Sequence, residues 1–270
     1  MSVVVKSYPG LAEAASALSA DNSARFLGGG TLLMRAVNSG DQSFTTVVRA
    51  DDPAAKTIVA QGDRITIGAG VTMAQIIASR DVEFLAPVAR LIGGPAIRTM
   101  GTVGGNLFAH APFGDLTTAL LALDATVALA GNAAEQPLEA FLSVRENAPR
   151  PLVVSVSFRR PQTGTFRFRK VSRVKPKGAS VLAIAALLPQ SGGRVSGARI
   201  AYGSMAPLSL RMPAVEQALE GASLDEAGIS RALTVAVEGL DPPTDALASS
   251  WYRRAVAPVH LKRLLLGLED

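Results

Sequence analysis

The sequence predicts an α+β fold in two parts, and three observations support this. Strand-like segments gather in an early and a late cluster, mixed with helical segments, instead of alternating regularly with helices as in a doubly wound sheet. The late cluster is typical of an antiparallel meander, because short apolar strands are separated by turn residues. The chain has 270 residues, of which 48% are hydrophobic, which is enough for one large or two medium domains.

In the first part, residues 64–67 alternate apolar and polar side chains, as a half-buried strand does. Residues 73–78 have helical character, and Thr72 before them is expected to cap that helix. The other strands expected here are residues 3–5, 25–27, 46–49, 125–130 and 153–158. The other expected helices are residues 11–18, 85–91 and 115–123.

In the second part, the alternation at residues 166–171 and the apolar run at 180–188 predict two strands, and a glycine turn precedes a third strand at 195–203. Helices are expected at residues 213–219, 229–237 and 250–266, and Trp251 is expected in the core. Residues 161–164 (PQTG) are the best linker. The sequence therefore predicts a first domain over residues 1–162 and a second over 163–270.

Composition excludes several kinds of chemistry. The chain has no cysteine and two histidines, so it cannot form a disulfide, a thiolate nucleophile or a cysteine-ligated zinc or iron–sulfur site. The net charge of +5 lies after residue 162. A local cluster of bases at 167–177 suits a phosphate, an acidic partner or simply a solvated face, and no accompanying pattern favours nucleic acid.

The ends and apolar runs of the chain predict a cytoplasmic protein without membrane insertion. The first residues lack the apolar stretch and cleavage site of a signal peptide. The longest apolar runs, at residues 116–129 and 181–188, are shorter than the ~20 residues that a membrane helix needs.

Two glycine-rich loops carry the strongest functional signal. One is Leu27–Gly28–Gly29–Gly30–Thr31–Leu32, and the other is Gly101–Thr102–Val103–Gly104–Gly105–Asn106. Without a Cβ, glycine lets backbone N–H groups approach a phosphate closely, and the polar residues add further donors. Neither loop has the spacing of a Rossmann or Walker A loop. Each could be only a turn, but two such loops in one domain favour a diphosphate-containing cofactor.

Other catalytic patterns are weaker. There is no G-x-S-x-G nucleophile elbow. His110 could contact a ligand or act as a base, although a loop histidine bonded to backbone is the more common state. Asp115 opens a helix, so N-capping and a cofactor role are both open for it. His260 is expected to pack or to lie on the surface.

At the two loops the sequence resembles a known family, the medium, FAD-binding subunits of the molybdenum hydroxylases, which include carbon monoxide dehydrogenase and xanthine dehydrogenase. The segments that carry the resemblance are GGGTLL at residues 28–33, IRTMGTVGGNL at 97–107, PFGDLTTALLALDA at 112–125, ARIAYGSMAP at 198–207 and YRR at 252–254. They cover nearly the whole chain in order, and the second and third together are highly specific.

The resemblance implies a fold and a set of cofactor residues. The fold is an FAD-binding domain of two subdomains, of the PCMH or VAO type, followed by a smaller α+β domain with an antiparallel three-stranded sheet. The two glycine loops would bind the diphosphate and ribityl parts of FAD. The remaining implied FAD neighbours are His110, Asp115, Val153 and Lys170. Thr31 stands where flavoproteins with a covalent histidyl link place histidine, so FAD is expected to bind non-covalently.

The resemblance also implies partners. Iron–sulfur clusters would lie on a small subunit and molybdenum–pterin on a large one, in a dimer of heterotrimers, and electrons would pass through FAD on this chain to an external acceptor. Bases at Lys175 and Lys177, where several relatives carry acids, predict a raised flavin potential and an acceptor that is not simply NAD. The alternatives are a free-standing FAD oxidoreductase of the same fold, or a binding protein that has lost FAD.

Overall fold

The computed structural model describes residues 3–175 and 178–268, and these form two compact units. One contains the chain up to Ala109 together with Ala125–Arg159; the other contains His110–Asp124 and the chain from Arg160 onward. Helix α7 therefore belongs to the second unit, although it lies in the first half of the sequence. The boundary after Gln162 stays a prediction of where two domains separate.

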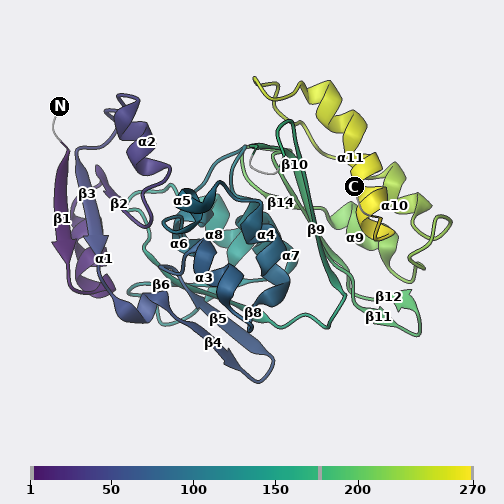
Figure 1. Cartoon of the computed structure of the whole chain (residues 1–270), viewed down its shortest axis with the longest axis horizontal. Coiled ribbons are helices and arrows are strands. Elements are labelled where there is room, and N and C mark those ends of the chain that lie inside the picture. Colours follow the sequence, from purple (N-terminus) through teal and green to yellow (C-terminus); the bar gives the residue numbers. More distant parts are fainter. Residues whose placement is uncertain (1–2, 176–177, 269–270) are drawn as a thin grey trace. The chain divides into compact units, whose positions relative to one another are not determined.

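The first unit begins with a small parallel sheet. Strands β1 (Val4–Tyr8), β2 (Ala24–Phe26) and β3 (Thr46–Ala50) lie in the order β1-β3-β2. Helix α1 (Leu11–Ala20) connects β1 to β2, and α2 (Leu33–Asn38) follows β2 (Figure 1). The side chains that α1 buries against this sheet are Leu11, Ala14 and Leu18.

A five-stranded antiparallel sheet forms the rest of this unit's framework, in the order β4-β5-β8-β6-β7. Its strands are β4 (Ile58–Gln61), β5 (Arg64–Gly68), β6 (Thr126–Leu129), β7 (Gln136–Pro137) and β8 (Val153–Arg159). The predicted alternation in β5 is confirmed, because Ile65 and Ile67 are buried whereas Arg64 is exposed. Strand β4 was missing from the sequence-based prediction.

Short helices pack beside this sheet (Figure 1). They are η1 (Pro53–Lys56), α3 (Met73–Ala78), η2 (Glu83–Leu85), α4 (Ala86–Arg90), α5 (Pro95–Arg98), α6 (Val103–Leu107) and α8 (Leu138–Val144). The cap predicted for α3 is confirmed: Thr72 Oγ1 accepts from Gln75 N–H at 3.3 Å, and Gln75 Oε1 accepts from Thr72 N–H at 2.8 Å. This reciprocal pair fixes where α3 begins.

The second unit is built on an antiparallel sheet in the order β14-β13-β10-β9. The long strands are β9 (Phe166–Ser172), β10 (Ser180–Leu187) and β13 (Arg199–Gly203), and the two-residue β14 (Leu210–Arg211) adds a fourth strand to the predicted three. The strand predicted over residues 195–203 is interrupted at Gly197, where φ is +74°. A separate hairpin precedes β13, formed by two strands of two residues each, β11 (Gln190–Ser191) and β12 (Arg194–Val195).

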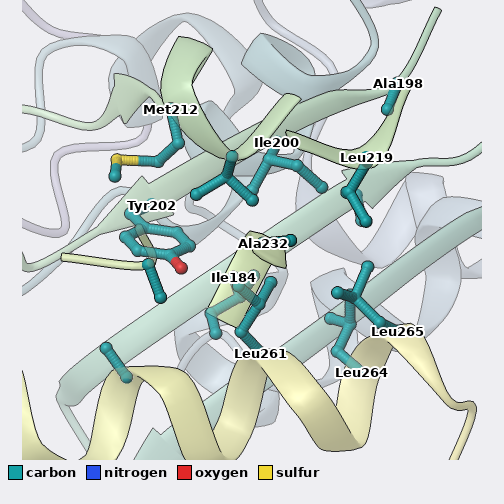
Figure 2. Packing of buried hydrophobic residues seen from close by; sticks show 14 of the residues in the cluster. Ile184, Ala198, Ile200, Tyr202, Met212, Leu219, Ala232, Leu261, Leu264 and Leu265 are labelled. Carbon is teal, nitrogen blue, oxygen red and sulfur yellow. The ribbon is translucent and has the colours of Figure 1, made fainter. Parts of the chain in front are cut away.

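One face of this sheet carries the main core of the unit. Helices α9 (Pro213–Leu219), α10 (Ser230–Thr234) and α11 (Ser250–Leu265) cover it (Figure 1). Figure 2 shows the strand residues Ile184, Ile200 and Tyr202 in the same buried cluster as the α11 residues Leu261, Leu264 and Leu265. The prediction that Trp251 lies in this core is wrong, since Trp251 is 74% exposed on α11.

The other face of the sheet is lined by small residues and is covered by α7 (Asp115–Ala122). Ala183 pairs with Gly203 and Ala185 with Ala201, so the residues on this face leave room for a closely packed helix. A Cβ on Gly203 would lie 2.4 Å from Thr118 Oγ1 of α7. This close packing explains why α7 belongs to the second unit. Among the described residues no helix is long and apolar enough to cross a membrane.

Candidate functional site

The first glycine loop, residues 27–32, connects β2 to α2, and most of its backbone N–H donors are unused. Leu27 N–H still donates to Val48 of β3, at 2.7 Å. Beyond it, none of the N–H groups of residues 28–32 donates to another residue in the described part of the chain. Gly30 has φ +70°, a conformation that glycine adopts without steric cost. The loop therefore presents a row of open N–H donors.

The second glycine loop, residues 101–106, uses its donors inside the protein. Gly101 N–H donates to Ile97 at 2.7 Å, and Val103 and Gly104 N–H donate to Val71 and Ala69 at 2.9 and 2.8 Å. Gly105 N–H donates to Thr102 Oγ1 at 3.1 Å, which caps α6 as an N-cap threonine does. Most of the N–H groups that the sequence offers to a phosphate here are therefore used within the protein, and those of Val103 and Gly104 hold the loop against the segment between β5 and α3.

The two loops pack directly on each other, and two glycines permit this contact. A Cβ on Gly29 would lie 1.6 Å from the carbonyl oxygen of Met100, and one on Gly28 would lie 2.7 Å from Thr102 Oγ1. No side chain fits at Gly29 without separating the loops. A close contact therefore explains why these residues are glycines. At Gly29, however, the contact is with protein backbone and not with a phosphate.

The glycines of the second loop also differ from each other. A Cβ on buried Gly104 would lie 2.9 Å from the Cβ of Ala69 and 3.1 Å from its carbonyl oxygen. Gly105 is exposed, and a Cβ there would meet only Thr102 Oγ1, at 3.1 Å. The absence of a side chain at Gly105 is therefore not required by backbone packing, and it leaves an open surface for a ligand.

A cavity of about 810 Å³ adjoins the first loop. This is within the ~300–1,000 Å³ usual for cofactor and small-molecule sites. Its lining combines the loop with residues from η1, α2, α5 and the start of α3: Leu27, Gly28, Gly29, Gly30, Thr31, Met34, Arg35, Asn38, Ser39, Lys56, Gly70, Thr72, Gln75, Ile97, Met100 and Thr102. The lining includes two bases and no carboxylate, so together with the open N–H groups it suits an anionic ligand.

Several lining residues were not identified from the sequence. Arg35 and Lys56 are the cationic ones, and Lys56 Nζ also lies 2.5 Å from Asp51. Neither is part of a recognised motif: Arg35 follows the first loop on α2, and Lys56 comes from η1, farther along the chain. Gln75 could have been found from the sequence, since Thr72-x-x-Gln75 is a capping-box pattern and both residues line the cavity.

The predicted site residues fall into two groups. The glycine loops and Val153 belong to the first unit, whereas His110, Asp115 and Lys170 belong to the second. Within the first unit, Ala69 connects the second loop to β8, because its carbonyl accepts from Gly104 and its N–H donates to Val154 at 2.8 Å. Val153 itself is buried.

In the second unit the structure brings Asp115 and Lys170 together. Lys170 Nζ lies 2.7 Å from Asp115 Oδ2, and Ser180 Oγ donates to Asp115 Oδ1 at 2.6 Å. The two charged side chains are only 7% and 5% exposed. Gly114, not Asp115, is the N-cap of α7, so the capping role considered for Asp115 is wrong. His110 is exposed.

Much of the predicted basic cluster fastens β9 to other parts of its own unit. Arg167 donates to the carbonyls of Leu264 and Leu265 at the end of α11, and Arg169 donates to that of Leu268. Cations are favourable at a helix C-terminus, where carbonyl groups lack helical partners. Lys177 lies outside the described residues. Among those described, no three His, Asp or Glu side chains are arranged to hold a metal ion.

Comparison with known proteins identifies the family. Residues 8–159 match the family described as the FAD binding domain in molybdopterin dehydrogenase. The chain belongs to this family. Residues 167–268 of this flavoprotein match the CO dehydrogenase flavoprotein C-terminal domain. The predicted family, its FAD cofactor and its class, an oxidoreductase subunit, are thereby confirmed.

Individual relatives agree with this assignment. The flavoprotein is 27% identical to the carbon monoxide dehydrogenase medium chain of Hydrogenophaga pseudoflava, over 79% of this chain and 77% of the relative. It is 31% identical to the 6-hydroxypseudooxynicotine dehydrogenase complex subunit alpha of Paenarthrobacter nicotinovorans, over 74% of this chain and 71% of the relative.

A solved structure extends the likeness to the fold. Carbon monoxide dehydrogenase from Hydrogenophaga pseudoflava contains a chain that superposes with a TM-score of 0.88 at 25% identity, covering 98% of this chain and 96% of that chain. The predicted fold class, an FAD-binding domain followed by a smaller α+β domain, is confirmed by these matches together with the sheets described above.

Proposed function

We propose that this flavoprotein is the electron-transferring FAD subunit of a multi-subunit molybdenum hydroxylase. The observation that carries the proposal is the row of open N–H groups at residues 28–32, placed at a cavity whose lining includes Arg35 and Lys56. A bound FAD supplies the exchange between two-electron and one-electron chemistry, while the protein supplies binding and orientation.

The residues present fit the diphosphate of FAD. The N–H groups of Gly28, Gly29 and Gly30 donate to no other residue in the part of the chain that the structure describes, and the backbone at Thr31 and Leu32 continues the row. Thr31 Oγ1 also has no hydrogen-bond partner among the described residues. We propose that these groups bind the phosphate oxygens directly, with Leu27 as the fixed end of the loop.

The second loop has a different role in the proposal. Val103 and Gly104 hold the surface of the site in place by donating to the carbonyls of Val71 and Ala69, between β5 and α3. Thr102 caps α6, and exposed Gly105 lets the cofactor lie against that helix. We propose that Asn106, on the same helix, also contacts the cofactor. His110, Asp115, Val153 and Lys170 remain proposed neighbours of the flavin on the strength of the family resemblance.

The proposed partners follow from composition and from the relatives. The chain contains no cysteine, so cysteine-ligated iron–sulfur clusters must lie on another subunit. Two relatives are named as a medium chain and as a subunit of a dehydrogenase complex. We propose a small iron–sulfur subunit, a large molybdopterin subunit and a dimer of heterotrimers in the cytoplasm, with electrons leaving through FAD to an external acceptor.

The first test is titration of the purified full chain with FAD, followed by absorbance and by thermal unfolding. FAD at 100 times its Kd is expected to stabilise the chain by about 2.7 kcal/mol, and heat should release it intact. Failure of FAD to bind to the isolated chain and to the coexpressed complex would reject the proposal.

Partnership is tested by coexpression with neighbouring genes. Copurification with iron and molybdenum is expected. A flavoprotein that binds FAD, purifies alone and oxidises its own substrate would instead support a free-standing FAD oxidoreductase.

A further inference from the structure

Arg145 and Arg253 are the largest fully buried side chains among the described residues, and Arg145 is 1% exposed. It is the C-cap residue of α8, and its guanidinium points into the first unit. Removing a guanidinium from water is unfavourable unless hydrogen bonds replace the lost hydration. Burial accordingly lowers the pKa of Arg145 from its usual value.

The partners of Arg145 lie immediately after the second glycine loop. Its Nη1 donates to the carbonyl of Leu107, and its Nη2 donates to that of Ala109 at 3.1 Å. Leu107 is the last residue of α6, so the guanidinium occupies the negative end of that short helix. The same α6 carries Gly105 and Asn106.

A second residue of α8 contacts the same segment. Phe141 lies one helical turn before Arg145, and its ring packs edge-to-face on that of Phe108, with centroids 5.7 Å apart. Residues 107–109 are thus held by one aromatic contact and by hydrogen bonds from one guanidinium. The chain passes from the first unit into the second after Ala109.

We propose that Arg145 is a positioning residue for FAD: by binding the carbonyls of Leu107 and Ala109, it fixes α6 and the Asn106 side chain in the arrangement that the cofactor requires. This inference rests on the proposed function. An apolar side chain of similar volume would fill the same space without the desolvation penalty. The fork of the guanidinium supplies what such a side chain lacks, which is two directed donors at a fixed separation.

The test compares Arg145→Met and Arg145→Lys with Leu138→Ala in the full chain. Leu138 is buried on the same helix, so its truncation lowers stability without removing a bond to residues 107–109. The Kd for FAD, the visible circular dichroism of bound flavin and the Tm of the cofactor-free chain are measured for each variant, below the unfolding temperature.

Arg145→Met is expected to raise the Kd about tenfold, as loss of a charge-assisted hydrogen bond does, and to alter the flavin dichroism. The Kd of Arg145→Lys should lie between those of the original chain and Arg145→Met, because the lysine ammonium can donate to the carbonyls but lacks the planar fork of the guanidinium. Leu138→Ala should lower the Tm and leave the Kd within about twofold of the original.

Two results would overturn the inference: an unchanged Kd in folded Arg145→Met, or a Kd that rises equally in Leu138→Ala, which would show that the effect follows stability. If Arg145→Met does not fold, Arg145→Lys decides the question by the same criteria. Absence of FAD binding in the unmodified chain would instead count against the proposed function itself.

Discussion

The loop at residues 27–32 and the loop at residues 101–106 resemble each other in sequence, yet their backbones have different partners. In the first, the N–H groups of residues 28–32 donate to nothing in the described chain. In the second, Gly101, Val103 and Gly104 donate to neighbouring backbone, and Gly105 donates to Thr102. One loop has donors available for a ligand, and the other is largely part of the framework that holds the first.

A glycine in such a loop indicates that another group lies close to its backbone, but the sequence does not show whether that group is a ligand or another part of the protein. At Gly29 that group is the Met100 carbonyl, and at Gly104 it is Ala69. Only the paths of distant segments decide this. We therefore expect some glycine variants in these loops to lose stability and others to lose affinity for the cofactor.

The largest loss of stability should come from the second unit, where residues proposed as flavin neighbours also have bonding partners within the protein. Asp115 and Lys170 are proposed flavin neighbours, but their charges are paired with each other in the interior. Lys170→Met leaves a buried carboxylate without its cation, so it should cost about 3–5 kcal/mol. Urea unfolding measures this. The double variant with Asp115→Asn should recover part of the loss, and a stable Lys170→Met would show that the pair is not structural.

Gly29→Ala should have the next largest effect. The new Cβ would lie 1.6 Å from a backbone oxygen, so the loops must separate, at about 3 kcal/mol, and FAD binding should be lost with them. The control is Gly40→Ala, where no atom lies within 4 Å and φ is +82°; left-handed backbone alone should cost about 1 kcal/mol there. Equal losses of stability in Gly29→Ala and Gly40→Ala would contradict the close contact between the two loops.

Gly104→Ala should cost about 1–3 kcal/mol, because the added methyl meets Ala69 at 2.9 Å in a buried position. Thermal unfolding of the cofactor-free chain measures this directly. Since the clash is internal, the loss should be present without FAD. A variant as stable as the original would mean that α6 packs more loosely on Ala69 than described.

Gly105→Ala should have the smallest effect on stability and the most informative effect on binding. Alanine favours the helix by up to about 1 kcal/mol over glycine, and only Thr102 Oγ1 lies near the added Cβ. The chain should be as stable as before or slightly more so, yet bind FAD several-fold more weakly in a titration. Loss of stability with an unchanged affinity for FAD would show that Gly105, like Gly104, is required by packing within the protein.

The regular elements could be predicted where local signals determine them. Alternation located β5, and Thr72 located the start of α3, because each signal depends on residues within one strand or turn. Strand β4 was missed because Ile58–Gln61 lacks such a pattern. Helix α7 was expected from the sequence, but its membership of the second unit depends on the small residues of β10 and β13 that face it.

The candidate site could be predicted only as far as its motifs extend. The two glycine loops stand out in the sequence, whereas Lys56 of η1 joins the cavity through folding of a more distant segment, and Arg35 beside the first loop belongs to no recognised motif. Trp251 shows the converse failure, because hydrophobic character alone predicts burial, but α11 turns this side chain outward. Burial of Arg145 has no local signal either, since an arginine after a helix is usually solvated.

The most direct test of the distinction between the loops is amide hydrogen exchange of the full chain, resolved by residue, with and without FAD. We expect the N–H groups of residues 28–32 to exchange rapidly in the cofactor-free chain and to become protected on FAD binding. Those of Gly101, Val103 and Gly104 should already be protected before FAD is added, because they are bonded within the protein. Bound FAD that leaves residues 28–32 unprotected would contradict the account.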